Sequence, residues 1–285
     1  MSWAMSRVRP LAVRPSRTRS ARARARIRWA PPLYLSLCAL AGACAGAAPV
    51  ASAQPGAASS SPTAPPTPST EPSGDISLSN ETTLTTWAHS DESVSIYSEP
   101  ETGARRLARL HLLTEDGFPE VYMLLASYTD AQGREWVRLR IPGRPNGRTG
   151  WVERSALGAF HRTRWLLVIS LRARTITAYY AGHVRFRGPV GIGKPSSPTP
   201  PGHFWIRERF KLANRSSPYW PYALGTSDYS TLTDWPGGGV VGIHGDFGEP
   251  QSIPGDPSHG CVRMRDSDIA WLAPRLTLGT PVHIE

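Results

Sequence analysis

Short runs in which apolar and polar residues alternate, separated by Gly and Pro, recur from about residue 76 to the end of the sequence. Alternation with a period of two places one side of each run in a core, which is typical of β-strands. The 28 Pro and 26 Gly residues separate these runs with turns and loops. The sequence therefore predicts a mainly β protein, and its 285 residues are enough for two small domains.

Residues 76–158 form the first predicted domain. Turn residues bound its expected strands, which are 94–97, 120–128, 136–140 and 150–152. This spacing predicts a small β-barrel of about 80 residues. Trp136-Val137, then Gly147-Arg148-Thr149-Gly150-Trp151-Val152 and Leu157, resemble bacterial SH3-like domains. The resemblance implies a module that binds cell-wall peptides or serves as a spacer.

Residues 161–285 form the second predicted domain, which is also mainly β. Its expected strands are 165–171, 175–180, 184–187, 204–206 and 280–285. One short helix is expected at 267–272, where Asp266 would cap the first turn and Pro274 would end it.

Positive charge is concentrated at the N-terminal end. The formal net charge is +10, but nine Arg lie within residues 1–28, and beyond Ala53 the 23 Lys and Arg nearly match 22 Asp and Glu. The basic character therefore belongs to a targeting segment, and we expect no nucleic-acid partner.

Residues 1–53 have the three parts of a signal peptide. An Arg-rich stretch precedes the apolar residues 33–48, and Ala51-Ser52-Ala53 offers small residues for cleavage. An uncleaved membrane anchor and a lipid anchor on Cys44 are the alternatives. Residues 54–75, rich in Pro and Ser, predict a disordered linker. We expect an exported protein of the cell wall, periplasm or extracellular space, at the membrane only if anchored.

Removal of the signal peptide would leave Cys261 as the only cysteine of the three in the sequence. An unpaired thiol in an exported protein suggests a reactive role, although a buried inert cysteine is the alternative.

Two segments carry residues suited to thiol chemistry, namely 240–246, which contains His244, and 257–264, which contains Cys261. The thiolate is a strong nucleophile, and an imidazole can take the thiol proton and later protonate a leaving amine. His244 or His259 could serve as this base. On a strand, His259 would lie roughly 6–7 Å from Cys261 between Cα atoms, which is long for direct transfer.

Neighbouring residues suggest further roles. Gly260 would allow close approach of a substrate, and its N–H, with that of Cys261, could face an oxyanion. Arg263 could bind a carboxylate. A zinc site made by the His, Cys and Asp residues is the alternative, but its spacing fits no common structural zinc pattern. His203 and His283 are interpreted as ordinary core or surface histidines.

The His244 segment with Ser258-His259-Gly260-Cys261-Val262-Arg263 resembles the signature of the L,D-transpeptidase family with a YkuD-type catalytic domain. Residues 199–204 and 279–282 resemble two other stretches of that family, so the resemblance spans about residues 161–285. It implies a YkuD-type β-sandwich or mixed-sheet catalytic domain with one short helix, following the SH3-like barrel.

The resemblance also implies the activity. Cys261 would attack the third residue of a peptidoglycan stem tetrapeptide and form a thioester, which the amine of a neighbouring stem would resolve into a 3→3 cross-link. His244 would be the proton acceptor and donor, Gly260 would orient it through its carbonyl, and His259 would line the oxyanion region. No cofactor or metal is implied, and carbapenem-type β-lactams are implied inactivators. Hydrolysis of the same thioester, or wall binding without catalysis, are the alternative functions.

Substrate contacts are expected from Ser258, Arg263, Gly245, Asp246 and Tyr229. The family resemblance implies support of the loop by Ser258 and a polar contact from Arg263. Asp246 stands where Thr or Ser is usual in the family, so it could stabilise an imidazolium or repel an anionic stem. The aromatic stretch 217–239, which includes Tyr229, is interpreted as a lid or wall of the substrate site.

Overall fold

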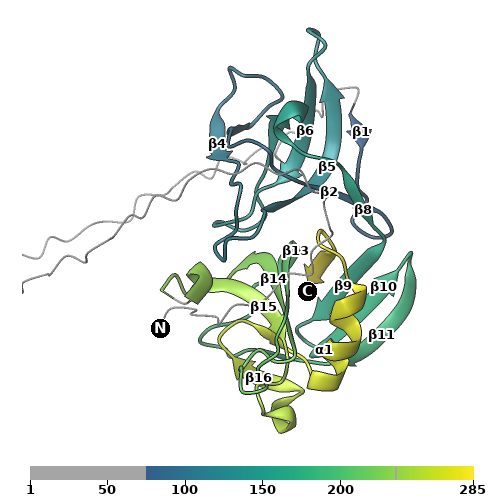
Figure 1. Cartoon of the computed structure of the whole chain (residues 1–285), viewed down its shortest axis with the longest axis vertical. Helices are drawn as coiled ribbons and strands as arrows, with labels where there is room; N and C mark the ends of the chain where they lie inside the picture. The colour runs from purple at the N-terminus through teal and green to yellow at the C-terminus, as the bar shows by residue number, and fades with distance from the viewer. Residues whose placement is uncertain (1–74, 235) are drawn as a thin grey trace, which may run out of the picture. The chain divides into compact units, whose positions relative to one another are not determined.

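The computed structural model describes residues 75–285, except residue 235. The predicted signal peptide, and the predicted linker up to residue 74, lie outside the described residues. Among the described residues, no helix is both long and apolar enough to cross a membrane. Within them the chain is mainly β, as predicted, with two sheets and one short α-helix (Figure 1).

The first sheet has eight strands, in the order β4-β3-β7-β6-β5-β2-β8, with β1 paired to β5. The paired neighbours are antiparallel. Its strands are β1 (Ile76–Ser77), β2 (Thr85–His89), β3 (Ser95–Tyr97), β4 (Arg106–Arg109), β5 (Val121–Thr129), β6 (Glu135–Arg140), β7 (Thr149–Glu153) and β8 (His161–Thr163). The four strands expected in this region are thus β3, β5, β6 and β7, whereas the SH3-like resemblance stays a prediction.

Strand β8 extends the first sheet beyond the expected domain boundary. Its residues pair with β2, Thr163 opposite Thr85 and His161 opposite Trp87. A 3₁₀ helix at Arg154–Ala156 precedes it. Residues 161–163 therefore belong to the first sheet by their hydrogen bonding, and the second sheet starts with the next strand.

The second sheet has ten strands, in the order β11-β10-β9-β18-β13-β14-β15-β17-β12-β16. Three of its pairs are parallel, namely β9 with β18, β15 with β17, and β12 with β16. Its strands are β9 (Trp165–Ser170), β10 (Thr175–Tyr180), β11 (His183–Pro189), β12 (Gly191–Gly193), β13 (Gly202–Lys211), β14 (Tyr222–Tyr229), β15 (Val240–His244), β16 (Gly255–Ser258), β17 (Val262–Arg263) and β18 (Pro281–Ile284).

Strand β14 contains residues 222–229 of the stretch 217–239, which was interpreted as a lid or wall and of which Ala223 and Gly225 line the pocket beside Cys261 and His244. It lies between β13 and β15, and seven of its eight residues are buried. Aromatic residues fit a strand of a packed sheet as well as they fit a substrate wall, so composition could not separate the two. Only the flanking residues, among them the 3₁₀ segment Pro236–Gly239, lie outside the strand.

Each sheet has its own apolar core. Leu124, Val137 and Leu139 belong to the core of the first sheet. In the second, Leu167, Phe204 and Val262 pack with Leu272 of helix α1 (Asp266–Leu272). The helix was predicted, but Arg265 occupies the N-cap position in place of Asp266, and no side chain caps the helix there. A smaller cluster joins Trp87, Val121 and Met123 of the first sheet to Trp205 of the second.

Candidate active site

The two segments predicted to carry thiol chemistry lie side by side. Strands β15 and β17 are parallel neighbours, with Ile243 opposite Val262 and His244 opposite Arg263. This register places Cys261, the residue just before β17, beside Gly242. Because strand side chains alternate, His244 projects from the face of β15 to which a side chain at position 242 would also point. Cys261 and His244 therefore meet on a single face of the sheet.

Gly242 provides the space for this meeting. Its N–H lies 3.4 Å from Cys261 Sγ, within hydrogen-bonding range of sulfur. A Cβ atom at position 242 would lie 4.0 Å from Sγ and 4.0 Å from Cδ2 of His244. The thiol and the imidazole thus flank the same small volume, which a larger side chain at this position would occupy. The sequence analysis assigned Gly242 no role, although its place two residues before His244 was visible.

His244 is held in one orientation within the core. Its side chain is buried, and Nδ1 donates to the carbonyl oxygen of Gly245 at 2.9 Å. The ring of Tyr219 meets the imidazole edge-to-face at 4.9 Å between centroids. A proton on Nδ1 leaves Nε2 with its lone pair, which is the form that a general base requires. Gly245, for which a substrate contact was expected, thus serves His244 through its carbonyl.

Burial favours the neutral form of both groups. Desolvation lowers the pKa of His244 to about 4, with a smaller contribution from Arg263, while the hydrogen bond to Gly245 acts in the opposite direction. Burial also raises the pKa of the Cys261 thiol, opposed by the Gly242 N–H and the charge of Arg263. The resting site consequently holds a thiol and a neutral imidazole, with no preformed ion pair.

The loop before Cys261 is fixed by its own side chains and by residues 194–199. Ser258 Oγ donates to the carbonyl of Cys261 at 2.6 Å and accepts from the N–H of Gly260 at 3.1 Å. Thr199 Oγ1 donates to the carbonyl of Gly260 at 2.7 Å. Gly260 has φ +125°, a conformation that side-chain-bearing residues rarely adopt. Ser258 therefore supports the loop, as the family resemblance implied.

The contacts of Gly260 differ from those expected. Its carbonyl was expected to orient His244, and its N–H to face an oxyanion. In the structure His244 Nδ1 donates to the carbonyl of Gly245 instead. The carbonyl of Gly260 accepts a hydrogen bond from Thr199, and the N–H of Gly260 donates to Ser258. Thr199 lay in a stretch matched to the family, but nothing local in the sequence indicated its partner 61 positions away.

The imidazole of His259 contacts Lys194. Its Nε2 lies 2.7 Å from Nζ of Lys194, and its carbonyl accepts from Ser197 Oγ at 2.7 Å. The His259 side chain is exposed. This places a cationic side chain at the exposed side of the Cys261 loop, and the sequence analysis had not identified Lys194.

The remaining predicted substrate residues have partners within the protein. Arg263 Nη1 bonds Glu249 at 2.8 Å, and its guanidinium lies 4.6 Å from the ring centre of Phe247. The Asp246 carboxylate accepts from the N–H of Gly248 at 2.9 Å, and the backbone N–H of Asp246 donates to the Asp266 carboxylate at 3.0 Å. Asp246 thus ties its loop to the start of helix α1.

Tyr229 lies in a buried polar cluster between the two sheets. Its hydroxyl donates to Glu115 and accepts from Arg207 Nη1 at 2.9 Å. Arg207 also pairs with Glu120, through Nε at 2.7 Å, and both of these side chains are buried. Tyr229 therefore stabilises the contact between the sheets, and the structure gives no substrate-facing role to its hydroxyl.

A pocket of about 50 Å³ opens beside Cys261 and His244. Tyr219 and Gly242 line it, together with the carboxylic acids Asp116 and Glu208. Burial raises the pKa of Glu208 to about 7, although Thr114 opposes the shift by hydrogen bonding. The first sheet thus contributes to the pocket through the loop that carries Asp116, a residue for which the sequence offered no signal.

Comparison with known proteins finds similarity to L,D-transpeptidases. Residues 164–284 match a family model described as the YkuD L,D-transpeptidase catalytic domain. A putative L,D-transpeptidase YkuD of Bacillus subtilis is 32% identical over 118 residues, or 41% of this chain and 64% of the relative. L,D-transpeptidase 1 of Mycobacterium tuberculosis is 29% identical over 128 residues, or 41% of this chain and 49% of the relative.

A crystal structure of an Enterococcus faecium L,D-transpeptidase mutant is similar over 42% of this chain and 49% of that chain, with 26% sequence identity and a TM-score of 0.34. The chain thus spans between about half and two thirds of the length of the two curated relatives. The family match at 164–284 includes both His244 and Cys261.

Proposed function

We propose that the protein transfers acyl groups between peptidoglycan stem peptides through a thioester on Cys261, because residues 164–284 match a family model described as the YkuD L,D-transpeptidase catalytic domain. The observation that carries this proposal is the shared face of β15 and β17. There Cys261 and the singly hydrogen-bonded imidazole of His244 lie on either side of Gly242.

In the first half-reaction Cys261 Sγ attacks the carbonyl carbon of the third stem residue. The thiol proton passes to Nε2 of His244 as the carbon–sulfur bond forms. The resulting imidazolium gives that proton to the nitrogen of the departing D-Ala as the peptide bond breaks. The products are a thioester and free D-Ala, and His244 returns to its neutral form.

In the second half-reaction an amine from a neighbouring stem attacks the thioester. His244 accepts a proton from the attacking amine and gives it to Sγ of Cys261 as the carbon–sulfur bond breaks, so the thiol is released as the new amide, a 3→3 cross-link, forms. Water in place of the amine would give an L,D-carboxypeptidase from the same intermediate. The difference lies in which nucleophile reaches the thioester first.

The state of the two groups supports proton transfer during the attack. Since burial disfavours both the thiolate and the imidazolium, separation of charge is costly until the substrate carbonyl receives the electrons of sulfur. Among the described residues the thiol and the imidazole do not hydrogen-bond each other. We infer a small approach of the two when substrate binds, as is common for catalytic groups in unliganded enzymes.

Carbapenem-type β-lactams are expected inactivators because the same thiol can attack their strained lactam carbonyl. The nitrogen released by ring opening stays attached to the acyl group, so it does not leave the enzyme. Peptidoglycan as substrate fits the proposed export through residues 1–53, which would place the enzyme at the wall or in the periplasm. Wall-peptide binding by residues 76–158 remains part of the proposal.

Mass spectrometry of the intact protein tests the nucleophile. Incubation with a tetrapeptide stem or a carbapenem should give a covalent adduct in the parent protein, none in Cys261→Ala, and slow formation in His244→Ala. An adduct that persists at full yield in Cys261→Ala would overturn the mechanism.

A second measurement separates transfer from hydrolysis. Addition of a stem that carries a free side-chain amine should give cross-linked dimers with release of D-Ala. Release of D-Ala and tripeptide, without dimers at saturating amine, would identify the carboxypeptidase. Co-sedimentation of the full chain with purified wall material, with and without the Cys261→Ala change, tests wall binding apart from catalysis. Failure of both the adduct and the dimer assays, with sedimentation intact, would leave wall binding without catalysis.

A further inference from the structure

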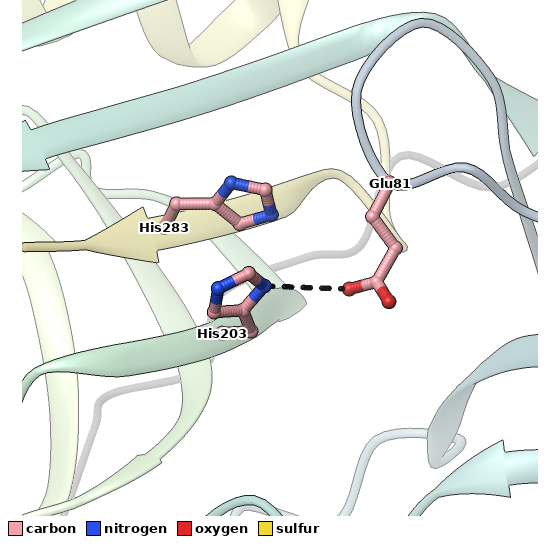
Figure 2. Close-up of side chains that lie close together, drawn as sticks. All are labelled: Glu81, His203 and His283. Carbon is pink, nitrogen blue, oxygen red and sulfur yellow. Dashed lines mark ion pairs between the residues drawn. The ribbon is translucent and has the colours of Figure 1, made fainter.

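Outside the catalytic site, three potential metal-ligating side chains converge from distant parts of the sequence. They are Glu81, from the loop before β2, His203 of β13 and His283 of β18 (Figure 2). One ligand atom of each lies within 4.8 Å of the other two. Both histidines were interpreted from the sequence as ordinary core or surface residues, and 80 positions separate them.

Strand register brings the two histidines together. His203 and His283 are directly opposite on the antiparallel pair β13 and β18. Directly opposed residues project to the same face of a sheet. The ring centroids are 4.2 Å apart, with 34° between the ring planes. Both rings turn a nitrogen edge toward Glu81 in Figure 2.

Nε2 of His283 is an orphan group. It is buried, and it has no hydrogen-bond partner among the described residues. A buried polar atom without a partner costs on the order of 1–3 kcal/mol, so native proteins seldom leave one unsatisfied. The nitrogen faces the space between the ring of His203 and the carboxylate of Glu81, where a bound ligand would satisfy it.

The carboxylate of Glu81 is held at this space by its loop and by an arginine. Asn80 Oδ1 accepts from the N–H groups of Thr82 and Thr83, at 3.0 and 2.8 Å, which fixes the loop. Arg140 donates from Nε to Oε2 at 3.0 Å and from Nη2 to Oε1 at 2.8 Å. Each carboxylate oxygen keeps a second lone-pair direction. Oε2 lies 4.0 Å from Nδ1 of His203.

We propose that Glu81, His203 and His283 bind one divalent transition-metal ion, of which Zn²⁺ is the expected member. Two imidazoles and one carboxylate suit Zn²⁺, Co²⁺ or Ni²⁺, whereas Mg²⁺ and Ca²⁺ prefer oxygen ligands. Three protein ligands leave a fourth position for water. Arg140 orients the carboxylate as outer-shell groups do, but its charge weakens cation binding.

The ligands need only small movements to close on an ion. Bonds of about 2.0–2.2 Å place tetrahedral ligand atoms roughly 3.3–3.6 Å apart. In the structure the three ligand atoms lie within 4.8 Å of one another. His203 has room for this adjustment because 57% of its side chain is exposed. The ion would tie the loop of Glu81, in the first sheet, to two neighbouring strands of the second. This role is structural and does not depend on the proposed transferase activity.

Cobalt(II) titration of the full chain tests the site, with Cys261→Ser in every sample to remove that thiol. We expect visible d–d absorption that saturates at one added ion per chain in this background. His203→Gln and Glu81→Gln should each raise the Co²⁺ dissociation constant by at least about tenfold. His183→Gln, on the exposed edge strand β11, is the matched control and should leave the constant unchanged. All other metal-binding groups of the chain are identical in these samples.

Thermal unfolding gives a second readout. Zn²⁺ should raise the Tm of the Cys261→Ser protein, EDTA should reverse the increase, and Mg²⁺ should have no effect. The increase should be lost in His203→Gln, whose exposed side chain makes a folding defect easy to exclude by its metal-free Tm. Equal Co²⁺ affinity in the His203→Gln and His183→Gln proteins would overturn the proposal, and so would an equal Tm increase with Mg²⁺. In either case the three side chains would form only an ion pair between protonated His203 and Glu81.

Discussion

The catalytic pocket and the contact between the two sheets both bury ionisable side chains, but they do so with opposite consequences. His244 is 3% exposed, its Nδ1 donates to a backbone carbonyl, and desolvation lowers its pKa to about 4. Arg207 is 2% exposed, but two carboxylates and a tyrosine hydroxyl face it, and its pKa is raised despite the opposing effect of burial.

The difference shows that the partner of a buried ionisable group decides whether the group is neutral or charged. Without a counter-charge, burial favours the neutral form, so His244 can take and return a proton at modest cost. With a counter-charge and full hydrogen bonding, the charged form persists, and the pair becomes a fixed contact between the sheets. The pocket therefore suits the proposed proton transfer, while the Arg207 cluster stabilises the arrangement around it.

Removal of His244 should have the largest effect on activity. His244→Gln keeps a polar side chain but removes the base, so the rate of Cys261 acylation by a carbapenem should fall by about 10²–10⁴. Stopped-flow or mass-spectrometric kinetics measures this rate. His259→Gln is the matched control, because its imidazole contacts Lys194 instead, and it should cost about tenfold or less. A larger loss in His259→Gln would assign the base to His259.

Removal of one charge from the sheet contact should mainly affect stability. Glu120→Gln leaves Arg207 buried with a weaker partner, so the free energy of unfolding should fall by about 3 kcal/mol. Glu115→Gln is the matched control, since it faces the same arginine from a side chain that is 35% exposed. It should cost less than about 1 kcal/mol. Chemical denaturation of both variants measures the difference, and equal losses would contradict the contrast drawn above.

The low pKa of His244 predicts that the rate of Cys261 acylation declines at an unusually low pH. The imidazole is the active base only when neutral, so acylation should persist as pH falls and decline only near pH 4. A histidine with the ordinary pKa of about 6.5 would lose roughly 30-fold between pH 8 and pH 5. The pH dependence of carbapenem acylation between pH 4 and 8, with the fold checked by circular dichroism, measures this. A midpoint near 6.5 would show that burial does not control the base.

The first sheet also contacts the segment beside the pocket through Arg144, and loss of this contact should have the smallest effect on activity. Arg144 donates from Nε to the carbonyl of Ser230 at 3.0 Å and from Nη2 to that of Gly238 at 2.9 Å. Arg144→Ala should release residues 230–239 and reduce transfer to the acceptor amine by about tenfold, equivalent to about 1.4 kcal/mol. Arg138→Ala, elsewhere in the first sheet, is the control. An unchanged rate of dimer formation in Arg144→Ala would confine the role of the first sheet to stability.

Local pattern in the sequence determined much of this protein. Alternation with a period of two gave β3 and β6, an apolar run gave β5, the residues after a Gly/Pro/Asn turn gave β7, and the run after Asp266 gave helix α1, because these signals depend on neighbours along the chain. The pairing of Cys261 with a histidine followed from chemistry, since a thiol needs a base. The order His244, Ser258-His259-Gly260-Cys261 was specific enough to indicate the family.

Contacts between residues distant in sequence were decided only by the tertiary structure. Tyr229 and Arg207 hydrogen-bond to Glu115, which precedes β5 of the first sheet. Thr199 donates to the carbonyl of Gly260. The register of β13 and β18 places His203 opposite His283. The physical reason is that the sequence pattern tells which face of a strand is buried but not which strand covers it. A polar side chain takes its protonation state and its role from that partner.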